Sequence, residues 1–332
     1  MKTIIYTCPY VPAEWIAAYG LRPSRVMPAA LCSTGPLALT EGLCPYVHSF
    51  INEVITGPPH ADTCGVIITT ICDQMRRAFD ILVRRCNLPA FLMNVPHTWQ
   101  SVAAQKMYVD ELRRLGQFLL RLGGKPPSDD TLTQVMLEYN AARASILAAR
   151  SHLSARQHAE AIAAFGRDGL AKTLNKEVST QPLITGVPLA IVGGPLVTAD
   201  LDIFDIVEQS GGRIVLDATE TGERGLCAPF DRRRIHDDPL VELANGYFNG
   251  IPDASRRPNS ELYKWLKRGL LDRTVRGIIF RRYVWCDTWH AELRRLKDWI
   301  DLPILDIDVG GDSQAHQHRV PNRIHSFLET LQ

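Results

Sequence analysis

The stretch Gly65-Val-Ile-Ile-Thr-Thr-Ile-Cys72-Asp73 decides the fold. Its continuous apolar, β-branched run is typical of a strand that is buried on both faces. Gly277-Ile-Ile-Phe-Arg-Arg-Tyr-Val-Trp-Cys286-Asp287 repeats the pattern in the second half of the chain. Each stretch predicts a buried strand that ends in a Cys-Asp pair just before a helix, which is the arrangement of a parallel α/β sheet.

Further segments continue the alternation of strands and helices along the chain. Around the first stretch, residues 2–8 and 89–95 are expected strands and residues 73–85 are an expected helix. Short strands separated by helices imply parallel sheets with right-handed crossovers. In the second half, strands are expected at 188–194, 213–218, 277–285 and 302–308.

Helices are expected between the two sets of strands. Apolar residues recur at helical spacing from Tyr108 to Leu122, which indicates one buried helix face. Ser128 precedes two aspartates and a second apolar stripe, so it has the features of a helix N-cap. A third, alanine-rich helix is expected from about Ser154. We interpret these helices as scaffold.

The predicted fold class is therefore α/β, with two Rossmann-like, doubly wound parallel-sheet domains and an intervening helical segment. The N-terminal domain is expected to span residues 1–178 and to include the helical segment at 106–178. The C-terminal domain is expected to span residues 179–332. A chain of this length is enough for two domains of ordinary size.

The composition excludes several classes of function. Lys and Arg number 37 and Asp and Glu number 36, so the net charge is +1. Such a balance creates no strong field for nucleic acid or for an anionic membrane surface. No apolar run approaches a membrane span, and the apolar stretch at the N-terminus is too short for a signal peptide. We therefore expect a cytoplasmic protein that binds neither nucleic acid nor a membrane.

The cysteines point to a site. Cys72 and Cys286 follow buried strands, and open α/β sheets bind ligands at the carboxyl ends of their strands. Because a helix N-terminus lowers the pKa of a thiol, we expect two thiolates that face a common cleft. The alternative is two unrelated cysteines in the core. Cys44, which precedes Pro45 in an expected loop, is a candidate third thiol.

The familiar sequence motifs are absent. The chain has no Cys-x-x-Cys pair, so a metal site would have to be assembled from distant loops. It also lacks the P-loop, the dinucleotide fingerprint and the hydrolase nucleophile elbow. The glycine pair at 193–194 could cradle a phosphate at a helix start, or could simply form a tight turn after a strand.

Several segments together resemble the 2-hydroxyacyl-CoA dehydratase D-component family, which includes benzoyl-CoA reductase subunits and double-cubane cluster proteins. The opening YTCPYVPAE (6–14) is similar to the family's first motif, and VPNRIHSFLE (320–329) to its last. LCPYVHS (43–49), TICDQM (70–75) and WCDTW (285–289) resemble its three cysteine loops, in the family's order and over nearly the whole chain.

The resemblance implies an iron–sulfur cluster held by Cys44, Cys72 and Cys286, with the second domain supplying the third cysteine. Three cysteines would leave one iron of a four-iron, four-sulfur cubane without a thiolate, free for a substrate thioester or for a sulfide bridge in a double cubane. The resemblance further implies a homologous partner subunit, as a homodimer or a heterodimer, and a separate ATP-hydrolysing activator protein. The implied activity is radical dehydration of a 2-hydroxyacyl-CoA or reduction of an aromatic acyl-CoA. The resemblance identifies no catalytic residue and no residue that contacts coenzyme A.

Two other functions stay open. The chain could be a non-catalytic electron-transfer protein, or a double-cubane cluster protein that reduces a different small molecule. It could also be an α/β binding protein whose cysteines are structural or bind zinc. Departures from the family pattern, such as Thr288 in the third cysteine loop and the segment 250–253 without cysteine, leave the substrate and the cluster type open.

Overall fold

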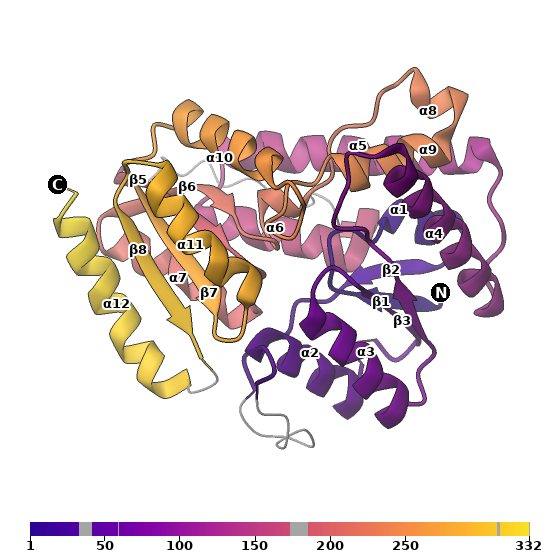
Figure 1. Cartoon of the computed structure of the whole chain (residues 1–332), viewed down its shortest axis with the longest axis horizontal. Coiled ribbons are helices and arrows are strands. Elements are labelled where there is room, and N and C mark those ends of the chain that lie inside the picture. Colours follow the sequence, from indigo (N-terminus) through magenta and orange to yellow (C-terminus); the bar gives the residue numbers. More distant parts are fainter. Residues whose placement is uncertain (33–41, 59, 173–184, 311–312, 332) are drawn as a thin grey trace.

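The computed structural model describes residues 1–32, 42–58, 60–172, 185–310 and 313–331. They form two parallel four-stranded sheets that lie side by side (Figure 1). The sheet order is β2-β1-β3-β4 in the N-terminal unit and β6-β5-β7-β8 in the C-terminal unit. The strands are β1 (Thr3–Tyr6), β2 (Arg22–Arg25), β3 (Thr63–Thr69), β4 (Ala90–Met93), β5 (Val187–Gly193), β6 (Gly212–Ala218), β7 (Gly277–Tyr283) and β8 (Ile304–Val309).

In each sheet the first strand is central, and the chain adds one strand on one side before it crosses to the other. This order places a topological switch point between β1 and β3 and another between β5 and β7. Crevices outside the carboxyl ends of the strands at such points are where open α/β sheets bind ligands. The predicted fold class, two Rossmann-like α/β domains, is confirmed.

Alternating side chains explain why both faces of the N-terminal sheet are covered. Ile5 packs with α2 (Pro45–Thr56) and α3 (Asp73–Arg85) on one face. Its neighbour Ile4 packs with helices on the opposite face. Those helices are α1 (Ala13–Ala18), α4 (Val102–Arg121) and α5 (Asp129–Ala148).

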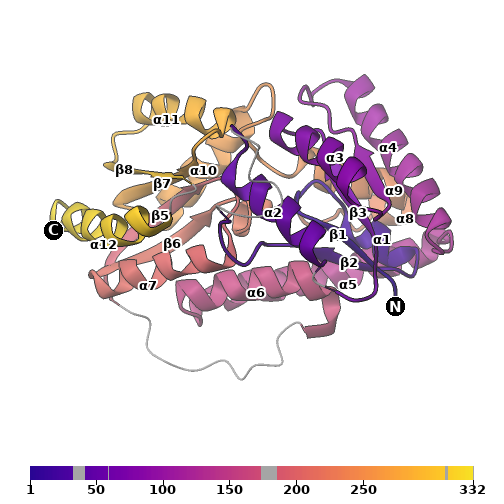
Figure 2. The same cartoon turned by 90° about the horizontal axis from the view of Figure 1, so that it is seen from below.

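The C-terminal sheet has the same arrangement. Ile191 packs with helices of one face and Ala190 with helices of the other. Figure 2 shows the two pairs of helices on opposite sides of this sheet. The pairs are α7 (Asp202–Gln209) with α12 (Ser313–Glu329), and α10 (Ser260–Asp272) with α11 (Asp287–Trp299).

Two segments connect the units. The helix α6 (Ala155–Asp168) contacts β2 in one unit and both β6 and α7 in the other. Residues 227–251, which include α8 (Arg234–Asp237) and α9 (Pro239–Ala244), contribute to the core of the N-terminal unit. The expected domain boundary at 178 lies outside the described residues. Short helical turns lie at Ala149–Ser151, Gly169–Lys172, Thr198–Leu201, Glu223–Gly225 and Asn245–Asn249.

The expected N-cap is confirmed at Ser128, whose side chain accepts a hydrogen bond from the first turn of α5, and Ser154 caps α6 in the same way. Within the described residues, none of the helices combines the length and apolar character that a bilayer crossing requires.

Candidate functional site

The three predicted cysteines occupy equivalent positions, because each is the N-cap residue of a helix. Cys44 precedes α2, Cys72 precedes α3 and Cys286 precedes α11. The sulfur of Cys72 accepts a hydrogen bond from the backbone N–H of Met75 at 3.4 Å. The sulfurs of Cys44 and Cys286 accept no such capping hydrogen bond within the described residues, although first-turn N–H groups lower the pKa of each thiol. Each sulfur therefore lies where the helix dipole and unpaired N–H groups favour negative charge.

This result refines one sequence expectation. Cys44 does lie at the end of the expected loop, but Pro45 belongs to α2, which starts directly after Cys44. The missed signal was a proline at the first helical position followed by an apolar stripe. Asp73 and Asp287 are the first helical residues after two of these caps.

Side-chain contacts bring the three cysteines together. The backbone N–H of Cys44 donates a 3.0 Å hydrogen bond to Oε1 of Gln74, two residues after Cys72. The ring of Tyr46 lies against the ring of Tyr283, with centroids 6.0 Å apart, and this contact joins the start of α2 to the end of β7. All three cysteines belong to or pack against one hydrophobic cluster that spans both units. Two sheets thus contribute thiols to one region at their carboxyl edges.

The thiols are close enough for their charges to interact. Burial raises the pKa of Cys72 well above its ordinary value, and the charges of Cys44 and Cys286 raise it further. Burial likewise raises the pKa of Cys286 to about 12, with Cys44 contributing, and raises the pKa of Cys44. The expectation of two free thiolates is therefore wrong for the chain alone, because burial outweighs the helix N-termini. A positively charged group is needed to hold all three as thiolates.

Thiolate sulfur is a ligand both for single metal ions and for iron–sulfur clusters. In the described part of the chain, no three His, Cys, Asp or Glu side chains are placed to hold one metal ion. An iron–sulfur cluster is larger than an ion, so its cysteine ligands lie farther apart. The three cysteines lie at separate helix starts, one buried and two partly buried, and an N–H group directed at sulfur, as at Cys72, is a contact that tunes such clusters.

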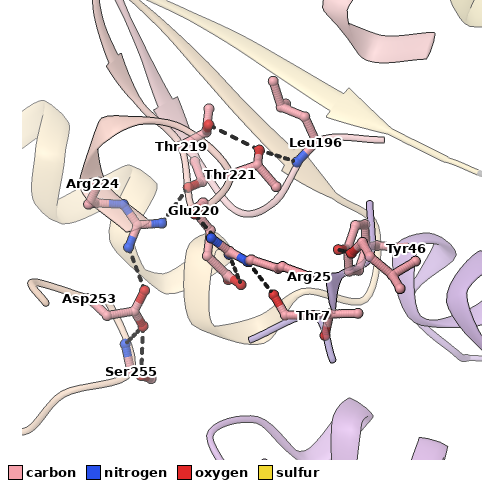
Figure 3. A network of polar contacts seen from close by, with 12 residues as sticks. Thr7, Arg25, Tyr46, Leu196, Thr219, Glu220, Thr221, Arg224, Asp253 and Ser255 are labelled. Atoms are coloured by element: carbon pink, nitrogen blue, oxygen red, sulfur yellow. Dashed lines mark hydrogen bonds and ion pairs between the residues drawn. The ribbon is translucent and has the colours of Figure 1, made fainter. Parts of the chain in front are cut away.

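A polar network lies beside the cysteines at the junction of the two units. Arg25, at the end of β2, donates to the carbonyl of Thr7 at 2.6 Å and to the carbonyl of Glu220 at 3.0 Å (Figure 3). Its guanidinium also pairs with Oε1 of Glu220 at 3.5 Å. Burial raises the pKa of Glu220 to about 7, against the opposing charge of Arg25. The negative charge of Glu220 also raises the pKa of Cys44, Cys72 and Cys286.

Glu220 was not among the residues predicted from the sequence. It follows β6 by two residues, in the polar run Thr219-Glu220-Thr221. The signal was available, because polar residues directly after a buried strand lie at the ligand-binding edge of an open sheet. From the sequence, only cysteines and glycines are predicted as candidates at the strand ends.

Arg224 anchors the turn that carries Glu220. Its side chain is fully buried and donates to the carbonyls of Ala218, Gly193 and Pro252 at 2.9–3.0 Å. It also pairs with Asp253 at 2.5 Å, as Figure 3 shows. A guanidinium that satisfies three carbonyls and a carboxylate at once fixes the backbone of the turn after β6.

Trp285 precedes Cys286 and is 60% exposed. Its backbone adopts φ +66°, which is uncommon for a residue other than glycine. Unusual backbone of this kind gathers at functional sites, because neighbouring structure must hold it in place. It allows the chain to turn sharply out of β7, so that the next residue caps α11.

The fold and the site define a class: a two-unit α/β protein with cysteines from both units, buried or partly buried, at one junction. The sequence agrees with a family model described as 2-hydroxyglutaryl-CoA dehydratase, D-component, over residues 8–331. The chain therefore belongs to that family and is a component of a dehydratase type of enzyme. A search of curated protein sequences finds no match.

Proposed function

We propose that the chain is the iron–sulfur subunit of an activator-dependent 2-hydroxyacyl-CoA dehydratase or aromatic acyl-CoA reductase, with Cys44, Cys72 and Cys286 as the cluster ligands. The observation that carries the proposal is the placement of three interacting thiols at three helix N-termini, from two sheets. Membership of the dehydratase component family supports the same reaction class.

The chain's own residues have defined tasks in this proposal. The three thiols give up their protons when the cluster binds, since only the thiolate is a ligand. Backbone N–H groups at the helix starts, such as that of Met75, then stabilise charge on sulfur. The packed rings of Tyr46 and Tyr283 exclude water from one side. When bound, a four-iron cluster supplies one-electron chemistry at low potential.

The partners follow from the reaction class. We propose a homologous subunit, in a homodimer or heterodimer, and a separate ATP-hydrolysing activator that supplies the electron. The substrate would be an acyl-CoA. We place the protein in the cytoplasm, where thiols stay reduced and available as ligands.

The test uses anaerobically purified, dithionite-reduced protein and 2-hydroxyglutaryl-CoA as the probe. A subunit that binds its substrate beside the cluster will show an altered EPR spectrum on addition of the probe, and free coenzyme A will cause no such change. A panel with aromatic acyl-CoA thioesters extends the test to the reductases. An EPR-active cluster that responds to none of these thioesters would contradict the enzyme assignment and favour an electron-transfer protein.

A further inference from the structure

Arg143 is a buried arginine whose hydrogen-bonding capacity is only partly used. It lies in α5, its side chain is 5% exposed, and its Nη1 donates to Oε1 of Glu14. The other oxygen of Glu14 accepts from the hydroxyl of Tyr247 at 2.6 Å, so this carboxylate has both oxygens engaged. Within the part of the chain that the structure describes, Nε and Nη2 of Arg143 are buried and have no hydrogen-bond partner. Two donors of a charged group are therefore unsatisfied where burial makes that costly.

The two unpartnered nitrogens lie on the same edge of the guanidinium. Their N–H bonds run nearly parallel, which is the geometry that binds both oxygens of one carboxylate. The ring of Phe230 lies under the guanidinium, with its centroid 4.9 Å from Cζ, and Glu14 holds the opposite nitrogen. These contacts fix the orientation of the free edge, as a preorganised binding site requires.

A cavity lies beside this guanidinium, at the junction of the two units. Arg143 forms part of its wall, together with Arg25 of β2 and with Tyr139, which lies one turn before Arg143 in α5. The volume of the cavity is about 60 Å³. Because one water molecule needs roughly 10–15 Å³ of such space, the cavity has room for roughly four to six non-hydrogen atoms.

The rest of the cavity wall is mainly apolar. The helix α6 contributes Ile162, Ala163 and Phe165, and the segment after β2 contributes Val26. Leu226, from the turn after β6, adds an apolar side chain from the other unit. A ligand that suits these walls carries one flat anionic group for the arginine and a short hydrocarbon chain.

We propose that this cavity binds a small aliphatic carboxylate, whose two oxygens accept hydrogen bonds from Nε and Nη2 of Arg143. The site goes beyond the proposed function, because it requires neither the cluster nor an acyl-CoA. Since both units contribute to the wall, a bound carboxylate would also stabilise their junction.

Isothermal titration calorimetry tests the site on anaerobically purified protein that has been dialysed into a carboxylate-free buffer. Propionate is the probe, and propionamide is its uncharged match of the same size. We expect propionate to bind once per chain and propionamide to bind about tenfold more weakly or worse, because the amide lacks the charge and the second acceptor oxygen.

Two variants test the named residues. Arg143→Lys keeps a cation beside Glu14 but removes the two parallel N–H groups, and Ala163→Phe fills the cavity while it leaves the arginine in place. Each should weaken propionate binding about tenfold or more. Ala164→Phe is the matched control, since Ala164 is the next residue of α6 and is not among the described residues that line the cavity. It should bind propionate as wild type does.

The comparison of the two probes on wild type needs no variant, so it decides the matter even if Arg143→Lys does not fold. Preference for propionate that is lost on filling the cavity supports the proposal. Wild type that binds propionate no better than propionamide overturns it, as does an Ala163→Phe protein with wild-type affinity.

Discussion

The backbone N–H of Cys44 donates a 3.0 Å hydrogen bond to Oε1 of Gln74, which lies in the first turn of α3. The amide nitrogen of Gln74 lies 3.4 Å from the carbonyl of Gly42 and donates to it. One side chain therefore fixes the approach to α2 relative to α3, and with it the position of Cys44 relative to Cys72. Two candidate ligands that are 28 residues apart in sequence share one support.

Replacing Gln74 tests this support. We predict that Gln74→Leu lowers the stability of the fold by only about 1 kcal/mol, because a typical hydrogen bond contributes that much. The larger effect falls on the cluster, which should lose iron to a chelator several-fold faster than in wild type. Iron release is followed by absorbance under anaerobic conditions. Gln117→Leu, an exposed site on α4, is the control, and equal release rates in all three proteins would refute the role of Gln74.

Removal of one thiol should abolish the cluster without unfolding the chain. We predict that Cys72→Ser has little bound iron but retains the wild-type circular dichroism, because the serine hydroxyl still caps α3. Cys86→Ser, at the C-terminal end of the same helix, should keep its full iron content. Iron and sulfide analysis of the two variants measures this, and a fully loaded Cys72→Ser protein would show that Cys72 is not a ligand.

Arg224 is expected to be the most sensitive structural residue near the site. Its removal leaves Asp253 buried without its cation, together with three carbonyls without their donor. We predict that Arg224→Ala lowers the free energy of unfolding by about 3–5 kcal/mol, the usual effect of breaking a buried ion pair. Urea titration of the metal-free chain gives the value. The exposed Arg234→Ala should stay within about 0.5 kcal/mol of wild type, as ordinary surface substitutions do.

The pH dependence of stability should reflect Asp217, which lies in the buried carboxyl-terminal part of β6. Burial raises the pKa of Asp217 from 3.8 to about 6, although Thr219 donates two hydrogen bonds to it. The folded chain therefore binds a proton more tightly than the unfolded chain, and stability falls as pH rises from about 4 to about 6. The rise in pKa corresponds to roughly 3 kcal/mol.

Asp217→Asn removes that titration. We predict that the variant gains stability relative to wild type between about pH 4 and about pH 7, by an amount approaching that value. Urea titrations of both metal-free proteins at the two pH values measure the difference. If the difference in stability between variant and wild type is the same at both pH values, Asp217 does not titrate in this range.

Periodicity and capping were enough to predict the helical scaffold and most strands. Residues 73–85 were predicted as a helix, and α3 has the same bounds, with Cys72 as its N-cap and basic residues in its last turn. The strand β2 was not predicted, since Arg-Pro-Ser-Arg carries no apolar run. It is an edge strand, where proline and charge are tolerated.

The positions of Cys72 and Cys286 could be predicted from the sequence, but the protonation of their thiols could not. The helix starts after β3 and β7 placed Cys72 and Cys286 at the sheet edges from sequence alone. Their protonation was predicted wrongly, because the depth of burial depends on packing between two units that are distant in sequence. Glu220 was missed for the same reason, as its importance comes from what it faces across the junction.

The most direct test of the account is the iron and acid-labile sulfide content of anaerobically purified protein, with EPR after dithionite reduction. We predict about four iron and four sulfide per chain and a reduced-cluster signal, as a four-iron cubane on three cysteines requires. Extra sulfide or unusual spin states would indicate a bridged double cubane on the same ligands. A chain that holds no iron after anaerobic purification and reconstitution would contradict the account.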